Sequence, residues 1–418
     1  MSGMHPRTLL AGLVLAAVLT GCRGSDPGLV RIVSSLPRTG SARQQSDTVV
    51  RGIRMAIEEA GGRAGPFRID YLDLDDSTAA TGLWTSEAEA ANARAALQDP
   101  DVVAYIGTLN SGSARVSMPI LNYGDLLMVS PATTAVGLTK PDLGEFGEPE
   151  VYRPTGRRNF IRVIPADDLQ GPLAADWAAG RGFKRVFVLD DGDAYGKGIA
   201  DLFAERCREL GLTVLGQDSI NPKAQEFRSL MATVAAAGPD LVYFGGTTQS
   251  KGGQVAKDLA ATGIESPLLV PDGCLEPAFI EAAGREAIEG RCYVTFGGIA
   301  PERLTGRGRA FVERYEKLHG EPPEAFAVYG YEAARVAIHA ITAAGVKDRR
   351  AITDAALAIR DFDGPLGRWS VDANGDTTLA ALTVLAVRDG RFAFEEQLEA
   401  GGVDPGKAKT VVENGGEG

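Results

Sequence analysis

Hydrophobic and polar positions follow two alternating patterns along the chain from residue 29 onward. Short runs rich in β-branched residues, such as 29–33 and 102–106, are typical of buried strands. Between them lie longer stretches, such as 47–60 and 199–210, in which apolar residues recur at helical spacing. Such repeated strand–helix units predict an α/β fold in which helices cover parallel, doubly wound sheets.

The strand–helix pattern runs twice, once on each side of residue 160. The predicted strands are too numerous to form a single sheet. They fall at 29–33, 67–72, 102–106, 126–129, 185–189, 213–215, 241–244, 268–270 and 291–295. Two similar α/β lobes are therefore expected. Near the end of the chain, Asn374-Gly375 is a strong two-residue turn signal, so we also expect a hairpin that joins residues 367–372 to 378–386.

The first 22 residues have a different pattern. An unbroken apolar run at 9–19 is too short to span a bilayer and fits the central region of a secretory signal. It ends in Leu19-Thr20-Gly21-Cys22, which resembles the lipobox of bacterial lipoprotein signals. We therefore expect residues 1–21 to be a lipoprotein signal peptide, Cys22 to carry a lipid, and residues 22–28 to form a tether. The alternative is an ordinary cleaved signal with a chance cysteine.

Composition and charge narrow the classes of function. The 418 residues, 44% of them hydrophobic, fit two or three globular domains and exclude a disordered chain. With 43 Lys and Arg against 55 Asp and Glu, the net charge of −12 disfavours a nucleic-acid partner, because phosphate binding needs a basic surface. The segment 401–418 is rich in glycine and charge and is expected to be a flexible tail.

The cysteines are interpreted in an exported context, in which disulfides persist. Cys274 follows the strand-like run 267–271 and Cys292 opens the next strand, so neighbouring parallel strands are expected to bring the two together as a disulfide. Cys207 lies in a helical pattern and is expected to be a buried thiol. The sequence has no CxxC motif, and neither a metal nor a cofactor is expected.

No catalytic constellation is visible in the sequence. Of the three histidines, His5 lies in the predicted signal, and His319 and His339 lie in helical patterns. No phosphate-binding or dinucleotide-binding glycine motif follows a strand, so an enzyme is not expected. Polar loops instead follow the carboxyl ends of predicted strands, at 107–114, 130–134, 190–198, 245–248 and 271–274. Ligands of open α/β sheets bind there, although serine and threonine also cap helices routinely.

Several of these segments together resemble a known family. They are NFIRVIPADDLQG at 159–171, RVFVLDDGDAYGKG at 185–198, SPATT at 130–134 and PDLVYFGG at 239–246. In order and spacing they are similar to type I periplasmic binding proteins. The most similar group is the branched-chain amino-acid-type (leucine/isoleucine/valine-binding-like) substrate-binding proteins of ABC transporters. The resemblance covers residues 29–395.

The resemblance implies two Rossmann-like lobes with parallel central sheets and a ligand held in the cleft between them. Three passages of the chain should join the lobes, near residues 163, 296 and 346. Lobe 1 is then expected to contain residues 29–163 and 297–345, and lobe 2 residues 164–296 and 346–400.

The resemblance also assigns ligand-binding positions in the cleft. They are Ser111, Ala132, Thr134, Tyr195, Thr247 and Asp272. Ser111 corresponds to a serine that binds a ligand carboxylate, Thr134 to a threonine that contacts carboxylate and ammonium, and Ala132 to a carbonyl that accepts from the ammonium. Tyr195 corresponds to a tyrosine of the second lobe that closes on the ligand, and Asp272 to an acid that faces the ammonium. Thr247 stands where amino-acid binders often have an aromatic residue.

The function that this resemblance implies is that of an extracytoplasmic solute-binding receptor of an ABC importer. Such a receptor would be lipid-anchored in the cell envelope, hold an amino acid or related small carboxylate by hinge closure, and hand it to an ABC permease in the membrane. The unusually polar loop at 38–45 leaves a polar amino acid, an amide or an aromatic acid open as the ligand. A sensor or signalling receptor of the same fold is the alternative function.

Overall fold

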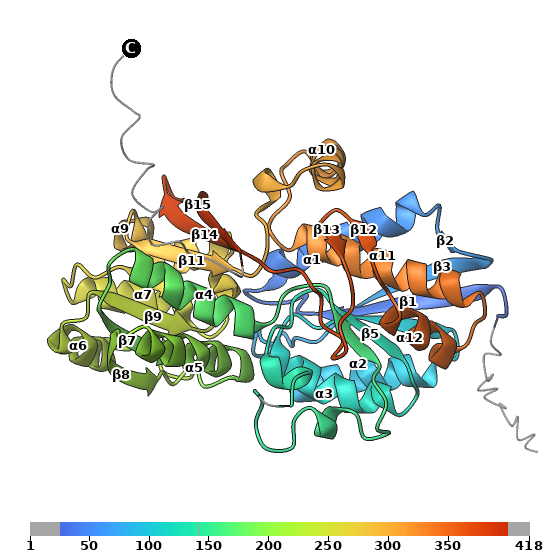
Figure 1. Cartoon of the computed structure of the whole chain (residues 1–418), viewed down its shortest axis with the longest axis horizontal. Helices are drawn as coiled ribbons and strands as arrows, with labels where there is room; N and C mark the ends of the chain where they lie inside the picture. Colours follow the sequence, from blue (N-terminus) through green and yellow to red (C-terminus); the bar gives the residue numbers. More distant parts are fainter. Residues whose placement is uncertain (1–25, 142, 400–418) are drawn as a thin grey trace, which may run out of the picture.

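Two separate β-sheets organise the molecule, and each forms the centre of one lobe (Figure 1). In this computed structural model the chain is described over residues 26–141 and 143–399. The predicted signal peptide (1–21), the predicted lipid anchor Cys22 and the predicted tail (401–418) lie outside the described residues. The expected fold class, an α/β protein of two lobes with mainly parallel central sheets, is confirmed.

The sheet of lobe 1 has six strands in the order β2-β3-β1-β4-β5-β6. These strands are β1 (Leu29–Leu36), β2 (Arg63–Ala64), β3 (Phe67–Asp75), β4 (Val102–Gly107), β5 (Leu127–Ser130) and β6 (Phe160–Arg162). All neighbours are parallel except β2, which pairs antiparallel with β3. Every residue of β4 and β5 is buried, as expected of parallel strands that helices cover on both faces.

The helices of lobe 1 come from both ends of the chain. They are α1 (Arg43–Glu59), α2 (Ser86–Gln98), α3 (Ser111–Asn122), α10 (Arg307–His319), α11 (Ala327–Ala344) and α12 (Arg349–Leu357). α1 and α11 pack together on one face of the sheet, and α2 and α3 on the other. A Cβ on Gly330 would lie 2.3 Å from the Val49 carbonyl oxygen, so the close approach of α1 and α11 requires glycine there.

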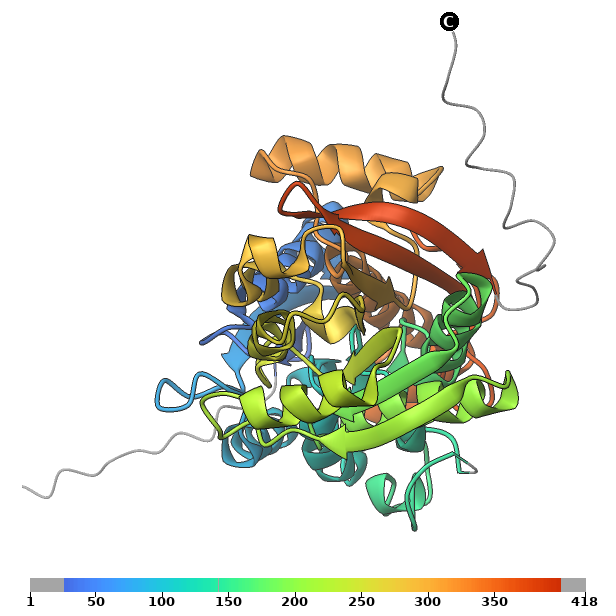
Figure 2. The ribbon, with the colours of Figure 1, turned by 90° about the vertical axis from the view of Figure 1, so that its left-hand side faces the viewer.

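The sheet of lobe 2 has seven strands in the order β15-β14-β11-β10-β9-β7-β8. These strands are β7 (Arg185–Asp190), β8 (Thr213–Ser219), β9 (Leu241–Gly245), β10 (Leu268–Val270), β11 (Cys292–Phe296), β14 (Ala381–Arg388) and β15 (Arg391–Glu399). β7 to β11 run parallel, whereas β14 and β15 form an antiparallel ribbon along one side (Figure 2). The helices of this lobe are α4 (Asp167–Gly180), α5 (Ala194–Glu209), α6 (Arg228–Ala237), α7 (Gly252–Ala261), α8 (Pro277–Ala283) and α9 (Arg285–Ile288).

Short elements connect these parts. They are the 3₁₀ helices η1 (Val136–Leu138), η2 (Glu150–Tyr152), η3 (Asp272–Cys274) and η4 (Pro301–Arg303) and the strands β12 (Phe362–Gly364) and β13 (Gly367–Trp369). Within residues 26–141 and 143–399, no helix has the length and apolar character needed to cross a bilayer. In the same two ranges, no His, Cys, Asp and Glu side chains are grouped in a way that could hold a metal ion.

The third passage between the lobes lies later in the chain than expected, so the boundary predicted near residue 346 is wrong. α12 follows α11 directly and packs on α11, β4 and β5 of lobe 1. Beyond it, the indole N–H of Trp369 donates to the Glu332 carboxylate of α11 at 2.8 Å. The chain returns to lobe 2 only with β14. The expected boundary came from the family resemblance alone, and the pattern of an amphipathic helix shows which of its faces is buried but not which sheet it covers.

The turn signal at Asn374-Gly375 is confirmed, and an isolated antiparallel bridge between Val371 and Thr377 closes it, but the longer hairpin expected between residues 367–372 and 378–386 does not form. The Asp372 carboxylate accepts the backbone N–H groups of Asn374 (2.7 Å), Gly375 (3.0 Å) and Asp376 (2.9 Å). β13 pairs with β12, however, and β14 pairs with β11 and β15. The turn lies where the chain leaves lobe 1, so the segments on its two sides belong to different sheets.

A buried ion pair ties the first passage to the third. Arg162, at the end of β6, is fully buried, and its Nε donates to Oδ1 of Asp376 at 2.7 Å. The backbone N–H of Arg162 donates to the Gly375 carbonyl at 3.1 Å. Burial alone would raise the pKa of Asp376, but the Arg162 guanidinium outweighs it and holds that pKa below its usual value. The pair therefore stays ionised and fixes the turn at 372–376 against β6.

Cys274 and Cys292 do not form the predicted disulfide, because both are free thiols. The strand register pairs Cys292 with Leu268, at the amino end of β10, whereas Cys274 lies in η3, beyond the carboxyl end of β10. The two thiols thus lie at opposite ends of the same pair of strands. Cys207 is a buried free thiol, as expected, and burial raises its pKa to about 12.

Removal of one partner of the Arg162–Asp376 pair should destabilise the fold strongly. Asp376→Asn leaves the buried guanidinium without its counter-ion, and the expected loss in the free energy of unfolding is about 3–5 kcal/mol. Urea denaturation followed by circular dichroism measures this loss. Asp354→Asn is the control, because its ion pair with Arg350 is exposed and the expected change is below about 0.5 kcal/mol. Equal losses in the two variants would contradict the role given to the buried pair.

Candidate functional site

A small cavity lies between the lobes, at the carboxyl ends of strands from both sheets. Its free volume is about 30 Å³, so the side chains of the two lobes nearly meet. The residues that line it are Gln45, Leu109, Asn110, Ser111, Ala132, Tyr195, Thr247, Gln249, Asp272, Gly273, Glu276 and Phe326. A solute much larger than water can enter only if the lobes separate.

Most of the ligand-binding residues expected from the sequence lie at this cavity. Those that line it are Ser111, Ala132, Tyr195, Thr247 and Asp272. Thr134 does not line it; its hydroxyl is buried, and neither this hydroxyl nor the carboxylate of Asp167, at the start of α4 in lobe 2, has a hydrogen-bond partner among the described residues. The Thr134 carbonyl accepts the Asp167 N–H, at 2.9 Å. The loops meet here because the carboxyl ends of parallel strands share one edge of a sheet.

The lobe 1 wall of the cavity is built at the N-terminus of α3. This helix begins at Ser111, shortly after β4, and Asn110 at its N-cap makes no side-chain capping bond. The first N–H groups of a helix have no partner within it, and the helix dipole adds partial positive charge there. The Ser111 hydroxyl is buried at the same point and accepts the Ala135 N–H at 3.3 Å. This wall can therefore bind an anion such as a carboxylate.

The loop after β5 completes the lobe 1 wall. The Ser130 hydroxyl oxygen accepts the N–H of Thr133 at 2.9 Å and that of Ala132 at 3.3 Å, so the chain turns sharply there. Arg162 supports the same loop, because its Nη1 donates to the carbonyls of Thr133 (3.3 Å) and Ala135 (2.9 Å). The guanidinium that joins two passages of the chain thus also positions Ala132.

The lobe 2 wall centres on Asp272, in η3. One of its carboxylate oxygens accepts the Tyr195 O–H at 2.5 Å, and the other accepts the Gly297 N–H at 3.4 Å. The Asp272 carbonyl accepts Nε2 of Gln45, which belongs to α1 of lobe 1, at 3.4 Å. Gly297 follows β11, where the chain passes from lobe 2 to lobe 1. Asp272 therefore contacts α5, the second passage and the opposite lobe.

The Asp272 carboxylate makes the lobe 2 wall of the cavity negative, and a second buried carboxyl group, that of Asp167, lies near it. Burial raises the pKa of Asp272 to about 6, although the Tyr195 O–H and the Gly297 N–H favour the ionised form. Burial also raises the pKa of Asp167 well above its usual value, and the negative charge of Asp272 adds to this shift. A cation beside Asp272 would be stabilised, so this wall can bind an ammonium group.

Thr247 lines the cavity but uses its hydroxyl to shape the start of α7. The Thr247 N–H donates to the Ser250 hydroxyl oxygen at 2.9 Å, and the Ser250 N–H donates to the Thr247 hydroxyl oxygen at 3.0 Å. This reciprocal arrangement fixes the loop that also brings Gln249 to the cavity.

Sequence reasoning missed several residues of the lining, among them Gln45, Gln249, Glu276 and Phe326. Gln45 ends the polar loop at 38–45, and Glu276 lies just past the loop at 271–274, so both are close to segments that the sequence singles out. Phe326 has no such signal, because it precedes α11 and reaches the cavity only through the folding of lobe 1.

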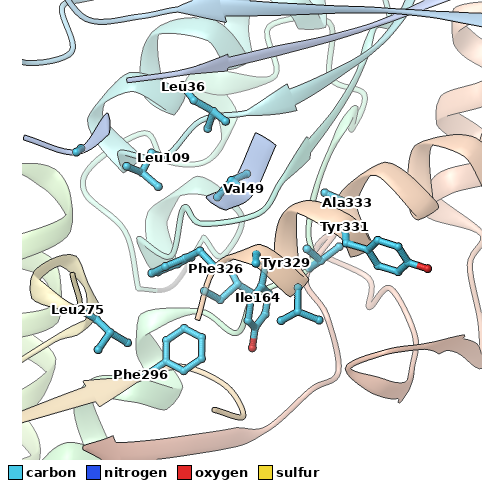
Figure 3. Packing of buried hydrophobic residues seen from close by; sticks show 14 of the residues in the cluster. Leu36, Val49, Leu109, Ile164, Leu275, Phe296, Phe326, Tyr329, Tyr331 and Ala333 are labelled. Atoms are coloured by element: carbon cyan, nitrogen blue, oxygen red, sulfur yellow. The ribbon is translucent and has the colours of Figure 1, made fainter. Parts of the chain in front are cut away.

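Aromatic side chains from both lobes pack next to the cavity (Figure 3). The ring of Phe296, at the end of β11, lies 5.5 Å from that of Phe326 at 73° and 5.6 Å from that of Tyr329 at 90°. Leu275 of lobe 2 lies beside Phe296 in the same view. These edge-to-face contacts join the second passage to the start of α11 and give the lobes an apolar contact behind the polar walls.

Comparison with known proteins places the chain among binding proteins. Residues 30–391 match the model of the periplasmic binding protein family. The Leu/Ile/Val-binding protein homolog 2 of Brucella abortus (strain 2308) is 26% identical over 394 residues, which cover 93% of this chain and 99% of the relative. The Leu/Ile/Val-binding protein homolog 1 of Brucella suis biovar 1 (strain 1330) is 27% identical over 399 residues, which cover 94% of this chain and 100% of the relative.

Solved structures share the two-lobed fold. The leucine binding protein LivK from Thermotoga maritima MSB8 is 28% identical, with a TM-score of 0.78 and coverage of 89% of this chain and 99% of that chain. The substrate binding protein LivJ from Streptococcus pneumoniae, in complex with isoleucine, is 19% identical, with a TM-score of 0.76 and coverage of 89% and 99%. A solute binding protein from R. palustris, in complex with benzoate, is 21% identical, with a TM-score of 0.73 and coverage of 88% and 96%. The last two likenesses show the fold alone.

The raised pKa of Asp272 predicts a pH-dependent contribution to stability. Folding raises this pKa from 3.8 to about 6, so between these values the folded state keeps a proton that the unfolded state has lost. The contribution of Asp272 to the free energy of unfolding should therefore fall as pH rises from about 4 to 7, by on the order of 3 kcal/mol in total.

Differential scanning fluorimetry of the wild type and of Asp272→Asn over this pH range measures the effect. The Tm of the wild type minus the Tm of the variant should decrease as pH rises. The matched control is Asp389→Asn, which changes an exposed carboxylate and should give a difference independent of pH. A difference that stays constant or increases for Asp272→Asn would refute the assignment.

Proposed function

The chain belongs to the periplasmic binding protein family, and from this premise we propose that it is the extracytoplasmic solute receptor of an ABC importer and binds an amino acid between its lobes. The observation that carries the proposal is the cavity, in which a helix N-terminus with Ser111 and the Asp272 carboxylate form two walls. The first wall suits a carboxylate and the second an ammonium group, the two charged groups that amino acids share. The names of the Brucella relatives and the isoleucine bound to LivJ support the same ligand class.

In the proposed mode the α-carboxylate of the ligand binds lobe 1, and its α-ammonium group contacts both lobes. The carboxylate accepts hydrogen bonds from the Ser111 hydroxyl and from the first N–H groups of α3. The ammonium group donates to the Asp272 carboxylate and to the carbonyl of Ala132. Tyr195 holds the Asp272 carboxylate in place, and Thr134 supports the site from behind its lobe 1 wall.

A ligand bound in this mode connects the two lobes and so favours closure of the hinge. The solute binds the lobe 1 wall first, and lobe 2 then brings Asp272, Tyr195 and Thr247 to it. Because these contacts exist only when the lobes are close, the ligand stabilises the closed form over the open one. A permease that recognises the closed form would then distinguish loaded receptors from empty ones.

An aromatic acid is the second candidate ligand. The R. palustris protein holds benzoate, and Phe326 gives the cavity of this chain an aromatic wall. An aromatic acid has no ammonium group, however, and would leave the buried Asp272 carboxylate without a cation. The Asp272 carboxylate therefore favours an amino acid over an aromatic acid.

The proposed receptor is anchored to the membrane through a lipid on Cys22, after removal of residues 1–21. The lipobox-like sequence Leu19-Thr20-Gly21-Cys22 supports this part of the proposal. The first described residues after it are attached to lobe 1, since the Asp26 carbonyl accepts from the Lys347 ammonium group at 2.7 Å. The anchor would thus hold the protein through lobe 1 and leave lobe 2 free to move.

Metabolic labelling with an alkyne-tagged fatty acid tests the anchor. The wild-type chain, produced in a bacterial host and isolated, should carry the label, and Cys22→Ala should lose it completely, because the thiol is the proposed attachment point. Cys207→Ala, which changes a buried thiol, should keep the label. Label retained by Cys22→Ala would rule out Cys22 as the anchor.

Isothermal titration calorimetry with the common amino acids and benzoate tests the ligand class. At least one amino acid should bind, and Ser111→Ala should weaken its binding by about 10–100-fold, because a hydrogen bond to a charged group contributes about 1.5–3 kcal/mol. Asp272→Asn should weaken it at least as much. Ser229→Ala, on the exposed side of α6, is the control and should leave the affinity unchanged. If no amino acid and no small carboxylate binds, the proposed function is refuted.

A further inference from the structure

The charges around the interlobe cavity exceed what a neutral amino acid can match. Asp272 and Glu276 are the acidic residues of the lining, and none of the described lining residues is Lys, Arg or His. A neutral amino acid brings one ammonium group, which the proposed mode pairs with Asp272. The carboxylate of Glu276 then needs a partner from another part of the ligand.

Glu276 is buried without a partner for its charge. Only 1% of the residue is exposed, and its Oε2 atom has no hydrogen-bond partner among the described residues. It occupies the N-cap position of α8, yet its side chain makes no capping bond, so a structural role as a helix cap does not account for it. A buried charge without a counter-ion is strongly unfavourable, and a bound cation would supply one.

A second carboxylate approaches Glu276 from the opposite lobe. Glu324 lies shortly before α11 in lobe 1; its Oε1 accepts Nε2 of Gln44 at 2.8 Å, and its Oε2 is buried without a hydrogen-bond partner. Burial raises the pKa of Glu276 to about 7, the nearby Thr248 hydroxyl opposes this shift, and the charge of Glu324 adds to it. Glu276 and Glu324, from opposite lobes, also line the same groove, so a cation beside both carboxylates would hold the lobes together.

Glu276 also lines a wider groove next to the cavity. The free volume of this groove is about 470 Å³. Much of its wall is apolar and includes Leu275, Ile280, Phe296, Leu385 and Phe392. Glu276 is the residue that lines both spaces, and Glu324 lines the groove as well. A ligand side chain that extends from the cavity towards the groove therefore meets the Glu276 carboxylate.

We propose that the solute is an amino acid with a cationic side chain, whose terminal ammonium or guanidinium group binds Glu276 with Glu324 beside it. This inference rests on the proposed function, because it takes the positions of the α-carboxylate and the α-ammonium group from the amino-acid mode. Each charge of such a ligand then faces an opposite charge: the α3 N-terminus, Asp272 and Glu276. A guanidinium group suits the site especially well, because its N–H donors can contact two carboxylates at once.

Glu276 is a specificity-determining residue in this mode. Leucine or isoleucine would place an apolar side chain against a buried carboxylate and leave that charge unpaired. The rival ligand is a neutral polar amino acid such as glutamine, to which a protonated Glu276 could donate a hydrogen bond. The two ligands make opposite demands on the charge of Glu276, so its amide variant separates them.

Calorimetric titration of the purified full-length protein at pH 8 with L-arginine, L-lysine, L-glutamine and L-leucine tests the inference. Arginine or lysine should bind at least about ten-fold more tightly than leucine and glutamine. Glu276→Gln should weaken arginine or lysine binding by about 30-fold or more and change leucine binding by less than about three-fold. Glu281→Gln is the matched control, because this exposed carboxylate of α8 lines only the groove, and the affinity should stay unchanged.

Failure of this inference is distinguishable from failure of the proposed function. If leucine or glutamine binds as tightly as arginine and lysine, the cationic ligand is overturned and the amino-acid receptor stands. If no amino acid binds, the proposed function itself fails. Should Glu276→Gln lower the Tm so far that binding is not measurable, Glu324→Gln decides: arginine binding weakened by about three-fold or more supports the inference, and unchanged binding overturns it.

Discussion

The buried ion pair between Arg162 and Asp376 connects parts of the molecule that lie far apart in the sequence. It joins the first passage between the lobes to the third, and the same guanidinium holds the carbonyls of Thr133 and Ala135 in the lobe 1 wall. A buried guanidinium is stable only when its charge and its N–H groups are all satisfied. A change in how the first and third passages are joined would therefore also move the loop that forms the lobe 1 wall of the ligand cavity.

The order of elements was predictable from the sequence because each strand–helix unit is a local pattern. α12 was not among the predicted helices, and its buried Ile352 and Ala356 would suit either sheet. The error over Cys274 and Cys292 has a related origin: β10 and β11 are neighbours as predicted, but their register separates the two thiols. Local signals thus predict elements and turns, whereas pairing and register depend on contacts made only in the folded chain.

The candidate site was predictable to the extent that it follows strand ends. Ser111, Ala132, Tyr195 and Asp272 all follow the carboxyl ends of parallel strands, two in each lobe, and the cavity lies where these strand ends meet. Phe326 directly precedes α11, and its position in the sequence gives no sign that it lines the cavity. The resulting cleft holds more buried negative charge than its own hydrogen bonds satisfy, so a cationic ligand would stabilise the folded protein as well as the closed form.

The strand order of lobe 2 leaves β8 and β15 at the two edges of its sheet. An edge strand presents unpaired backbone groups to which a strand of another molecule can add. On β15, however, Glu395 is engaged by Arg181 and Arg388, and β8 carries the exposed Asp218 near its end. A second molecule that approached β15 would meet these charged side chains, and it would bring a further net charge of −12. These charges disfavour strand addition at the edges of the lobe 2 sheet, even where many copies of the protein lie close together.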